Sequence, residues 1–194
     1  EAGDFDLTLT NTTLVGPGID QLQSIELAHL TGGPSPNVID ASGFNSNGLT
    51  FIDGAGGGDF LIGTSGTDIL TSSGNGNDVM HAGDGDDFVF AGSGRDTVWG
   101  GAGNDVLFGN GGSGDRLFGE DGNDRLNGGA GNDPELDGGA GNDQIFGGRG
   151  NDQIFGRGGR DSLCGGDGDD ELLGHNGADW LSGGAVTDVI DGGG

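Results

Sequence analysis

The chain of 194 residues has one cysteine, four prolines, no tyrosine and no lysine. With Cys164 as its single thiol, the chain cannot build a disulfide framework. Six arginines are its only strong bases, so it lacks the positive clusters that neutralise nucleic-acid phosphates, and we expect no nucleic-acid partner. No apolar run approaches the roughly 20 residues that cross a bilayer, so we expect no membrane span.

Glycine and acid are abundant instead. The chain holds 50 glycines and 32 acidic residues against six bases, which gives a formal net charge of −26. Glycine costs about 1 kcal/mol per helical position relative to alanine, which excludes a protein built from long helices. Four prolines without a strict Gly-X-Y period exclude collagen. Because such a chain has little apolar material for a core, we expect a cation to complete its fold.

Aspartate recurs every nine or ten residues, and a nine-residue frame surrounds each copy. Gly100-Gly-Ala-Gly-Asn-Asp-Val-Leu-Phe108 is one copy of this frame, and residues 138–146 form another. The sixth position is Asp in all 15 copies, the fourth is Gly except at Ser113 and Val186, and the eighth is usually a medium apolar residue. The sixth-position aspartates are Asp59, Asp68, Asp78, Asp87, Asp96, Asp105, Asp115, Asp124, Asp133, Asp143, Asp152, Asp161, Asp170, Asp179 and Asp188.

This frame resembles the nonapeptide repeat G-G-x-G-x-D-x-U-x of the RTX (repeats-in-toxin, haemolysin-type) calcium-binding family. The resemblance covers residues 54 to about 191. It implies an all-β fold, a right-handed parallel β-roll or β-solenoid. In that fold each nonapeptide gives a six-residue turn and a three-residue strand, and two nonapeptides make one coil. The family also implies a secreted bacterial protein, exported by a type I system and found outside the cell or at its surface.

The physics of short strands favours the same architecture. Three residues are too few for an independent strand, so stability must come from coil stacked on coil. The eighth position then points inward, while the seventh and ninth point outward. Aromatic ninth-position residues would form outward stripes, which we expect to stack on one another rather than to bind a partner.

Stacking also predicts two columns of aspartates. Residues 18 or 19 apart face each other at about 4.8 Å, and a ladder of like charges repels itself. A hard divalent cation removes that repulsion, and carboxylate and carbonyl oxygens suit Ca²⁺ better than Zn²⁺ or Mg²⁺. Columns of eight and seven turns leave at most 13 inter-turn sites. One column holds Asp59, Asp78, Asp96, Asp115, Asp133, Asp152, Asp170 and Asp188, and the other holds the remaining seven aspartates.

The resemblance further implies the ligands of each ion. Two same-side turns would contribute their sixth-position carboxylates, together with main-chain carbonyls from positions one to four. The turn glycines that we assign to these sites are Gly83, Gly85, Gly101, Gly103, Gly122, Gly129, Gly131, Gly139, Gly141, Gly148, Gly150, Gly166 and Gly168. The three ten-residue intervals and both missing fourth-position glycines fall in the column that begins at Asp59, so we expect distorted slots next to Asp115 and Asp188.

Residues 1–53 lack the repeat, and we interpret them as a calcium-free β-solenoid segment that caps the roll of residues 54–194. Strands are predicted over residues 5–9, 37–40 and 49–52, whereas residues 19–30 fit neither a helical nor a strand period.

No nucleophile motif, phosphate-binding loop or distinct carboxylate pair is present, so we predict no catalytic residues and no enzymatic activity in this chain. The leading hypothesis is a calcium-binding module that folds when it binds calcium. The alternative is an accessory module of a larger secreted enzyme (a protease, a lipase or a polysaccharide-modifying enzyme) or of an adhesin.

Overall fold

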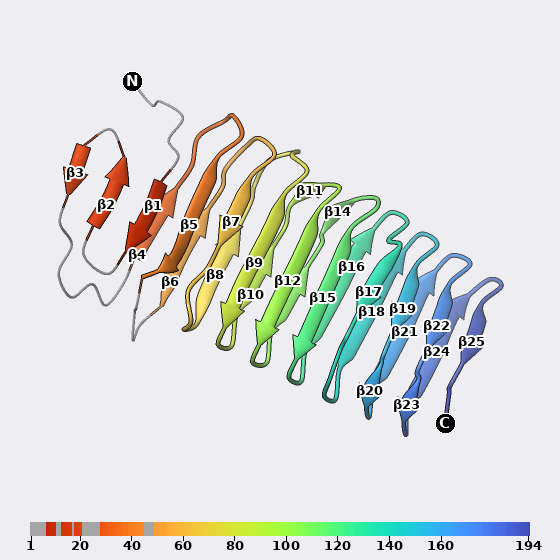
Figure 1. The fold of residues 1–194 in the computed structure, drawn as a ribbon. Helices are drawn as coiled ribbons and strands as arrows, with labels where there is room; N and C mark the ends of the chain where they lie inside the picture. The colour runs from red at the N-terminus through yellow and green to blue at the C-terminus, as the bar shows by residue number, and fades with distance from the viewer. Residues whose placement is uncertain (1–6, 11–12, 17, 21–27, 45–48) are drawn as a thin grey trace.

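The computed structural model describes residues 7–10, 13–16, 18–20, 28–44 and 49–194. In these ranges every regular element is a β-strand, so the predicted all-β class is confirmed. Parallel strands stack coil on coil into a β-solenoid of about nine turns, which runs from β4 at one end to the C-terminus at the other (Figure 1). The described residues contain no helix long and apolar enough to cross a membrane.

Two long sheets form the flat faces of the solenoid, and successive strands of each sheet are parallel from β4 and β5 onward. The first sheet has the order β25 (Val189–Asp191), β22 (Glu171–Leu173), β19 (Gln153–Phe155), β17 (Glu135–Asp137), β15 (Arg116–Asp121), β12 (Thr97–Ala102), β9 (Val79–Asp84), β7 (Phe60–Ile62), β5 (Val38–Gly43), β1 (Leu7–Thr10), β2 (Thr13–Gly16) and β3 (Gly18–Asp20).

The second sheet faces the first and has its own run of strands. Its order is β24 (Trp180–Ala185), β21 (Ser162–Asp167), β18 (Gln144–Arg149), β16 (Arg125–Ala130), β13 (Val106–Phe108), β10 (Phe88–Phe90), β8 (Asp68–Thr71), β6 (Thr50–Asp53) and β4 (Ala28–Thr31). Four two-residue strands lie in the turns: β11 (Ser93–Gly94), β14 (Gly111–Gly112), β20 (Gly158–Gly159) and β23 (Asn176–Gly177).

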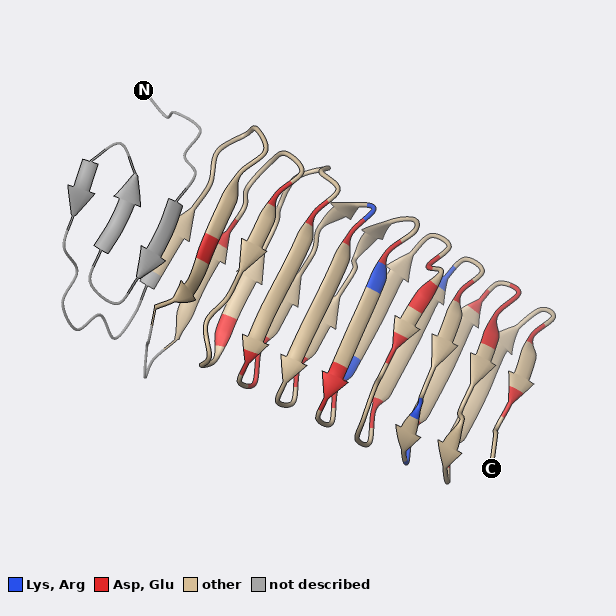
Figure 2. Cartoon of the chain, viewed as in Figure 1, with Lys and Arg blue, Asp and Glu red and all other residues tan. Residues whose placement is uncertain are grey.

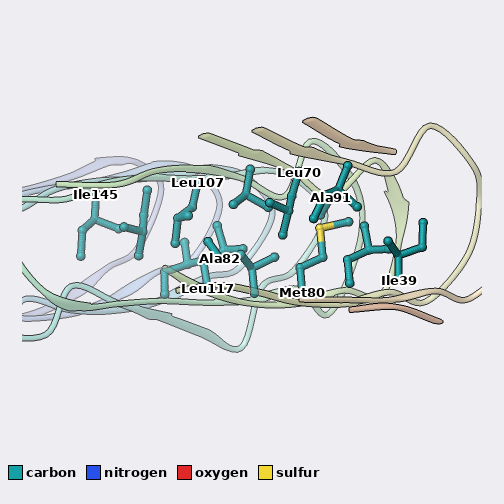
Figure 3. Close-up of a cluster of buried hydrophobic side chains, with 14 of the residues drawn as sticks. Ile39, Leu70, Met80, Ala82, Ala91, Leu107, Leu117 and Ile145 are labelled. Carbon is teal, nitrogen blue, oxygen red and sulfur yellow. The ribbon is translucent and has the colours of Figure 1, made fainter. Parts of the chain in front are cut away.

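The core is a single column of apolar side chains from each sheet, as the repeat predicts. In register, Val98 of β12 pairs with Met80 on one side and Leu117 on the other, and all three are fully buried. Figure 3 shows the two columns meeting between the sheets. Because each nonapeptide contributes so little apolar surface, the core alone gives each coil limited stabilisation.

Outward side chains follow the predicted alternation and stack along the solenoid axis. The rings of His81 and Trp99 lie parallel with centroids 4.3 Å apart, and those of Phe90 and Phe108 lie 5.1 Å apart. Each ring in these pairs covers a face of its neighbour, so the prediction that the stripes stack on themselves is confirmed.

Two of the three inserted residues are placed by the pairing register. Leu136, not Glu135, takes the buried eighth position between Leu117 and Ile154, so Pro134 is absorbed between the turn and its strand. Gly112 pairs with the fourth-position Gly94 and has a positive φ. The assignment of Ser113 as a lost fourth-position glycine was therefore wrong, because Ser113 is the inserted residue.

The segment before the repeats continues both sheets. Strands β5 and β6 confirm the strands predicted over residues 37–40 and 49–52. Strand β1 overlaps the one predicted over residues 5–9 and ends one residue later, and residues 5 and 6 lie outside the described residues. In the ambiguous stretch, Gly18–Asp20 and Ala28–Thr31 are strands, while residues 21–27 lie outside the described residues. Strands β1, β2 and β3 pair antiparallel, which the sequence did not predict. The division into a capping segment of residues 1–53 and a roll of residues 54–194 stays a prediction.

Replacing one core side chain should weaken the stack locally. Leu126 is fully buried between Leu107 and Ile145, so Leu126→Ala should lower the free energy of unfolding in saturating Ca²⁺ by about 2–5 kcal/mol, measured by denaturant titration. The control is Gln144→Ala at an exposed seventh position, which should change it by less than about 0.5 kcal/mol. Equal losses from both variants would contradict this account of the core.

Candidate metal centres in the stacked turns

The turns bend through positions two and four, where most copies place glycine in the left-handed region. All 13 glycines assigned from the sequence have a positive φ. At Gly101, for example, φ is 115°, and a Cβ would collide with the carbonyl oxygen of Gly83 in the coil below. The turns are therefore as closely stacked as the repeat predicts.

Further turn residues share this conformation but were missed. Nearly all of them stand at position two or four of the stacked turns. The frame itself could have identified the glycines other than Gly112, which the insertion before Asp115 moves out of its counted place. The other side chains gave no sequence signal for this conformation. The glycines are Gly57, Gly92, Gly94, Gly112, Gly114, Gly159, Gly177, Gly184 and Gly193, and the others are Ala55, Asn110, Glu120, Arg157, His175 and Val186.

The sixth-position aspartates form the two predicted columns. In each column the backbone N–H of one aspartate donates a hydrogen bond to Oδ1 of the aspartate in the next coil, for example from Asp124 to Asp143 at 2.8 Å. Thirteen such links join all 15 aspartates. The links from Asp115 and Asp170 are the longest, at 3.1 Å against 2.7–2.9 Å for the others. Both columns are therefore continuous, and the distortion of the ion slots next to Asp115 and Asp188 stays a prediction.

In most ladder aspartates the second carboxylate oxygen, Oδ2, lacks a hydrogen-bond partner. From Asp59 to Asp170 every ladder aspartate is buried, with at most 2% of its surface exposed. Thirteen of the 15 have a buried Oδ2 atom without a hydrogen-bond partner. A buried carboxylate oxygen in that state is costly unless a cation or a donor reaches it.

A main-chain oxygen from the next coil converges on the same space. A Cβ placed on Gly100 would lie less than 3.0 Å from both Oδ2 of Asp105 and the carbonyl oxygen of Gly119, which is the first-position glycine one coil further on. The same pair of oxygens surrounds the first-position glycines Gly63, Gly109, Gly119, Gly128, Gly147, Gly156, Gly165 and Gly174.

Three consecutive turns differ at this first position. Ser72, Ala82 and Ala91 stand there with buried side chains, and both alanines belong to the hydrophobic core. These three turns therefore lack the first-position glycine that the other turns have.

The donor set fits a hard cation. In the described part of the chain no three His, Cys, Asp or Glu side chains converge, so each slot offers two ladder carboxylates and main-chain carbonyls. These are the oxygen ligands that Ca²⁺ prefers, and they lack the nitrogen and sulfur that Zn²⁺ favours. The residues present therefore fit the cation that the repeat implies.

Burial also raises the pKa values of several ladder carboxyls, among them Asp87, Asp133 and Asp143. Desolvation is the largest cause throughout, and neighbouring ladder carboxylates add to it. The pKa rises to about 8 for Asp87 and to about 7 for Asp96, Asp133 and Asp143. Without a cation, the folded stack therefore holds these groups partly protonated near neutral pH.

A second ladder, not predicted from the sequence, runs along the exposed fifth position. Oδ1 of Asn104 accepts the backbone N–H of Asn123 at 3.0 Å, and Oδ1 of Asn123 accepts that of Asn142 at 2.9 Å. These bonds run opposite to the aspartate ladder, because in both of them the fifth-position N–H donates to the coil before it. Neighbouring residues thus tie each turn to the coils on both sides.

Acidic residues mark both rows of turns along the stack, and arginines are sparse (Figure 2).

The sequence profile of the RTX calcium-binding nonapeptide repeat (4 copies) matches residues 53–89, 72–98, 81–114, 110–133, 135–163 and 165–194, which is well over half of the chain. The chain belongs to this RTX family. It is accordingly a calcium-binding RTX module with a parallel β-solenoid fold. No curated protein matches the chain.

Two substitutions can separate the effect of the column geometry on Ca²⁺-dependent folding from the effect of net charge. Asp143 links to Asp124 and Asp161, so Asp143→Ala should raise the Ca²⁺ concentration at the folding midpoint and lower the melting temperature at fixed Ca²⁺. Asp191→Ala removes the same charge from an exposed ninth position and should change both little. Circular dichroism measures both quantities, and equal shifts would mean that net charge alone matters.

The raised pKa values predict how the metal-free stack responds to pH. A carboxyl whose pKa is raised in the fold destabilises it when ionised, so the metal-free stack should gain stability as the pH falls from about 8 toward 4. Protons also compete with Ca²⁺ for these carboxylates, so the increase in melting temperature on adding Ca²⁺ should be smaller at pH 5 than at pH 8. An increase that is the same at both pH values would contradict this reading of the ladder.

Proposed function

We propose that this RTX module is a calcium-triggered folding unit of a secreted bacterial protein and has no catalytic role of its own. The observation that supports this is the row of buried Oδ2 atoms without partners. Each such atom costs roughly 1–3 kcal/mol, and a stack with a thin core offers little to offset a dozen of them. Ca²⁺ between the turns supplies the missing partner.

The same requirement makes folding depend on the compartment. A ligand that binds only the folded chain stabilises it in proportion to the logarithm of its concentration. At the submicromolar Ca²⁺ of the cytosol the acidic chain stays unfolded, and at millimolar Ca²⁺ outside the cell it folds. An unfolded chain can be threaded through a type I secretion channel, so this route and an extracellular or cell-surface location belong to the proposal.

The site favours a structural role over catalysis. Thirteen of the 15 ladder aspartates share the same buried Oδ2 without a partner, whereas acid–base catalysis needs two groups with distinct roles. If the protein carries an activity, we place it in another part of a larger secreted enzyme or adhesin. The outward seventh position has no row of threonines, since Val79, Thr97 and Arg116 follow one another in register, and this disfavours an ice-binding face.

Folding should therefore depend on Ca²⁺ and be cooperative. Far-UV circular dichroism in excess chelator at pH 8 should show a largely unstructured chain, and millimolar Ca²⁺ should restore the β signal along a steep titration, because each ion joins two coils. The control is the same concentration of Mg²⁺, which should restore much less. A full β signal in chelator would refute the proposal.

A further inference from the structure

Asp68 differs from every other buried aspartate of the two columns. Its Oδ2 accepts the backbone N–H of Thr64 at 2.5 Å and the Thr64 hydroxyl at 3.0 Å, and its Oδ1 lies 3.1 Å from the same hydroxyl. The side chain of Thr50 also hydrogen-bonds to Asp68. Among the buried ladder aspartates, Asp68 alone has no unpartnered Oδ2.

The turn that leads to Asp68 also has a different backbone. Thr64 stands at position two, and none of residues 63–67 has a positive φ, whereas the turn of Asp105 has positive φ at both Gly101 and Gly103. The Thr64 hydroxyl accepts the N–H of Gly66 at 3.0 Å while it donates toward Asp68. This hydroxyl is therefore tied into its own turn on one side and into the carboxylate on the other.

In the coil before this turn, neutral residues occupy the column positions that aspartates occupy in later coils. Thr50 is in register with Asp68 and fully buried. Asn37 takes the equivalent place above Asp59, and its backbone N–H donates to Oδ1 of Asp59 at 2.9 Å. At this end of the stack, neutral hydrogen-bond donors stand where carboxylates stand in later coils.

We propose that the slot between Asp68 and Asp87 is a metal-free closure of its column. The N–H and hydroxyl of Thr64 donate to the carboxylate where a cation would bind in the other slots, so the calcium ladder on this side begins between Asp87 and Asp105. The N–H of Asp68 still donates to Oδ1 of Asp87 at 2.7 Å, so the backbone column is continuous through the closed slot. This inference rests on the proposed calcium function and reduces the 13 inter-turn sites by one.

Counting bound ions by native mass spectrometry at saturating Ca²⁺ tests the closure. Asp68→Asn preserves the shape of the side chain, and its amide can still accept the Thr64 N–H and donate to the Thr64 hydroxyl. This variant should bind as many ions as the unchanged chain.

The matched control is Asp143→Asn in a regular stretch, which should lose one or two ions. If Asp68→Asn and Asp143→Asn lose the same number, the closure is refuted and the calcium function stands. If Asp143→Asn loses none, the proposed function itself fails.

A gain of binding gives an independent test. Thr64→Gly removes the competing hydroxyl and restores the consensus residue at position two, so this variant should bind one more ion than the unchanged chain. A Thr64→Gly chain with no additional ion would overturn the closure. Circular dichroism in saturating Ca²⁺ confirms that each variant is folded, and if Asp68→Asn does not fold, the Thr64→Gly count decides.

Discussion

The repulsion between carboxylates stacked at the coil spacing is the constraint on which the rest of this structure depends. Parallel stacking repeats each residue along the axis, so an aspartate that forms a turn in one coil necessarily faces an aspartate in the next. Burial strengthens the repulsion and raises the pKa values of ladder carboxyls such as those of Asp87 and Asp143. In the function proposed above, a cation between the turns offsets that cost, which a thin core offsets little.

Hydrogen bonds fix the geometry in which that cation is needed. At Asp124, for example, Oδ1 accepts the N–H of Asp105 in the coil before it, and Oδ2 faces the carbonyl oxygen of Gly138 in the coil after it. The hydrogen bonds of the fifth-position ladder run in the opposite direction, since the N–H of Asn123 donates to Oδ1 of Asn104 in the coil before it. Since adjacent residues anchor each turn both ways, the oxygens are positioned before an ion arrives, which limits the entropy lost on binding.

The nine-residue period of the sequence predicted the structural features that recur in every nonapeptide. Spacing alone located the aspartate columns, the buried eighth position and the outward ring stacks. Spacing could not place the inserted residues. Counting back from Asp115 put Ser113 at the fourth position of its turn, whereas in the structure Gly112 takes that position. Nor could it predict the left-handed conformation of Glu120 or Arg157, which the neighbouring coils impose on side chains that rarely adopt it. The antiparallel start at β1–β3 lies outside the repeat and left no periodic signal.

The departures from the repeat near Thr64 explain how such a stack can begin. A cation that joins two coils is of little use to the first coil, which has no preceding turn to supply ligands. Asn37 donates to Oδ1 of Asp59, and Thr50 and Thr64 hydrogen-bond to Asp68. The opening coils therefore hold part of the first carboxylates without an ion and offer an edge on which the next turn can be ordered. In a linear array whose stability comes from interfaces between neighbours, one such edge lowers the cost of starting the stack, and each later ion then has to order only one further turn.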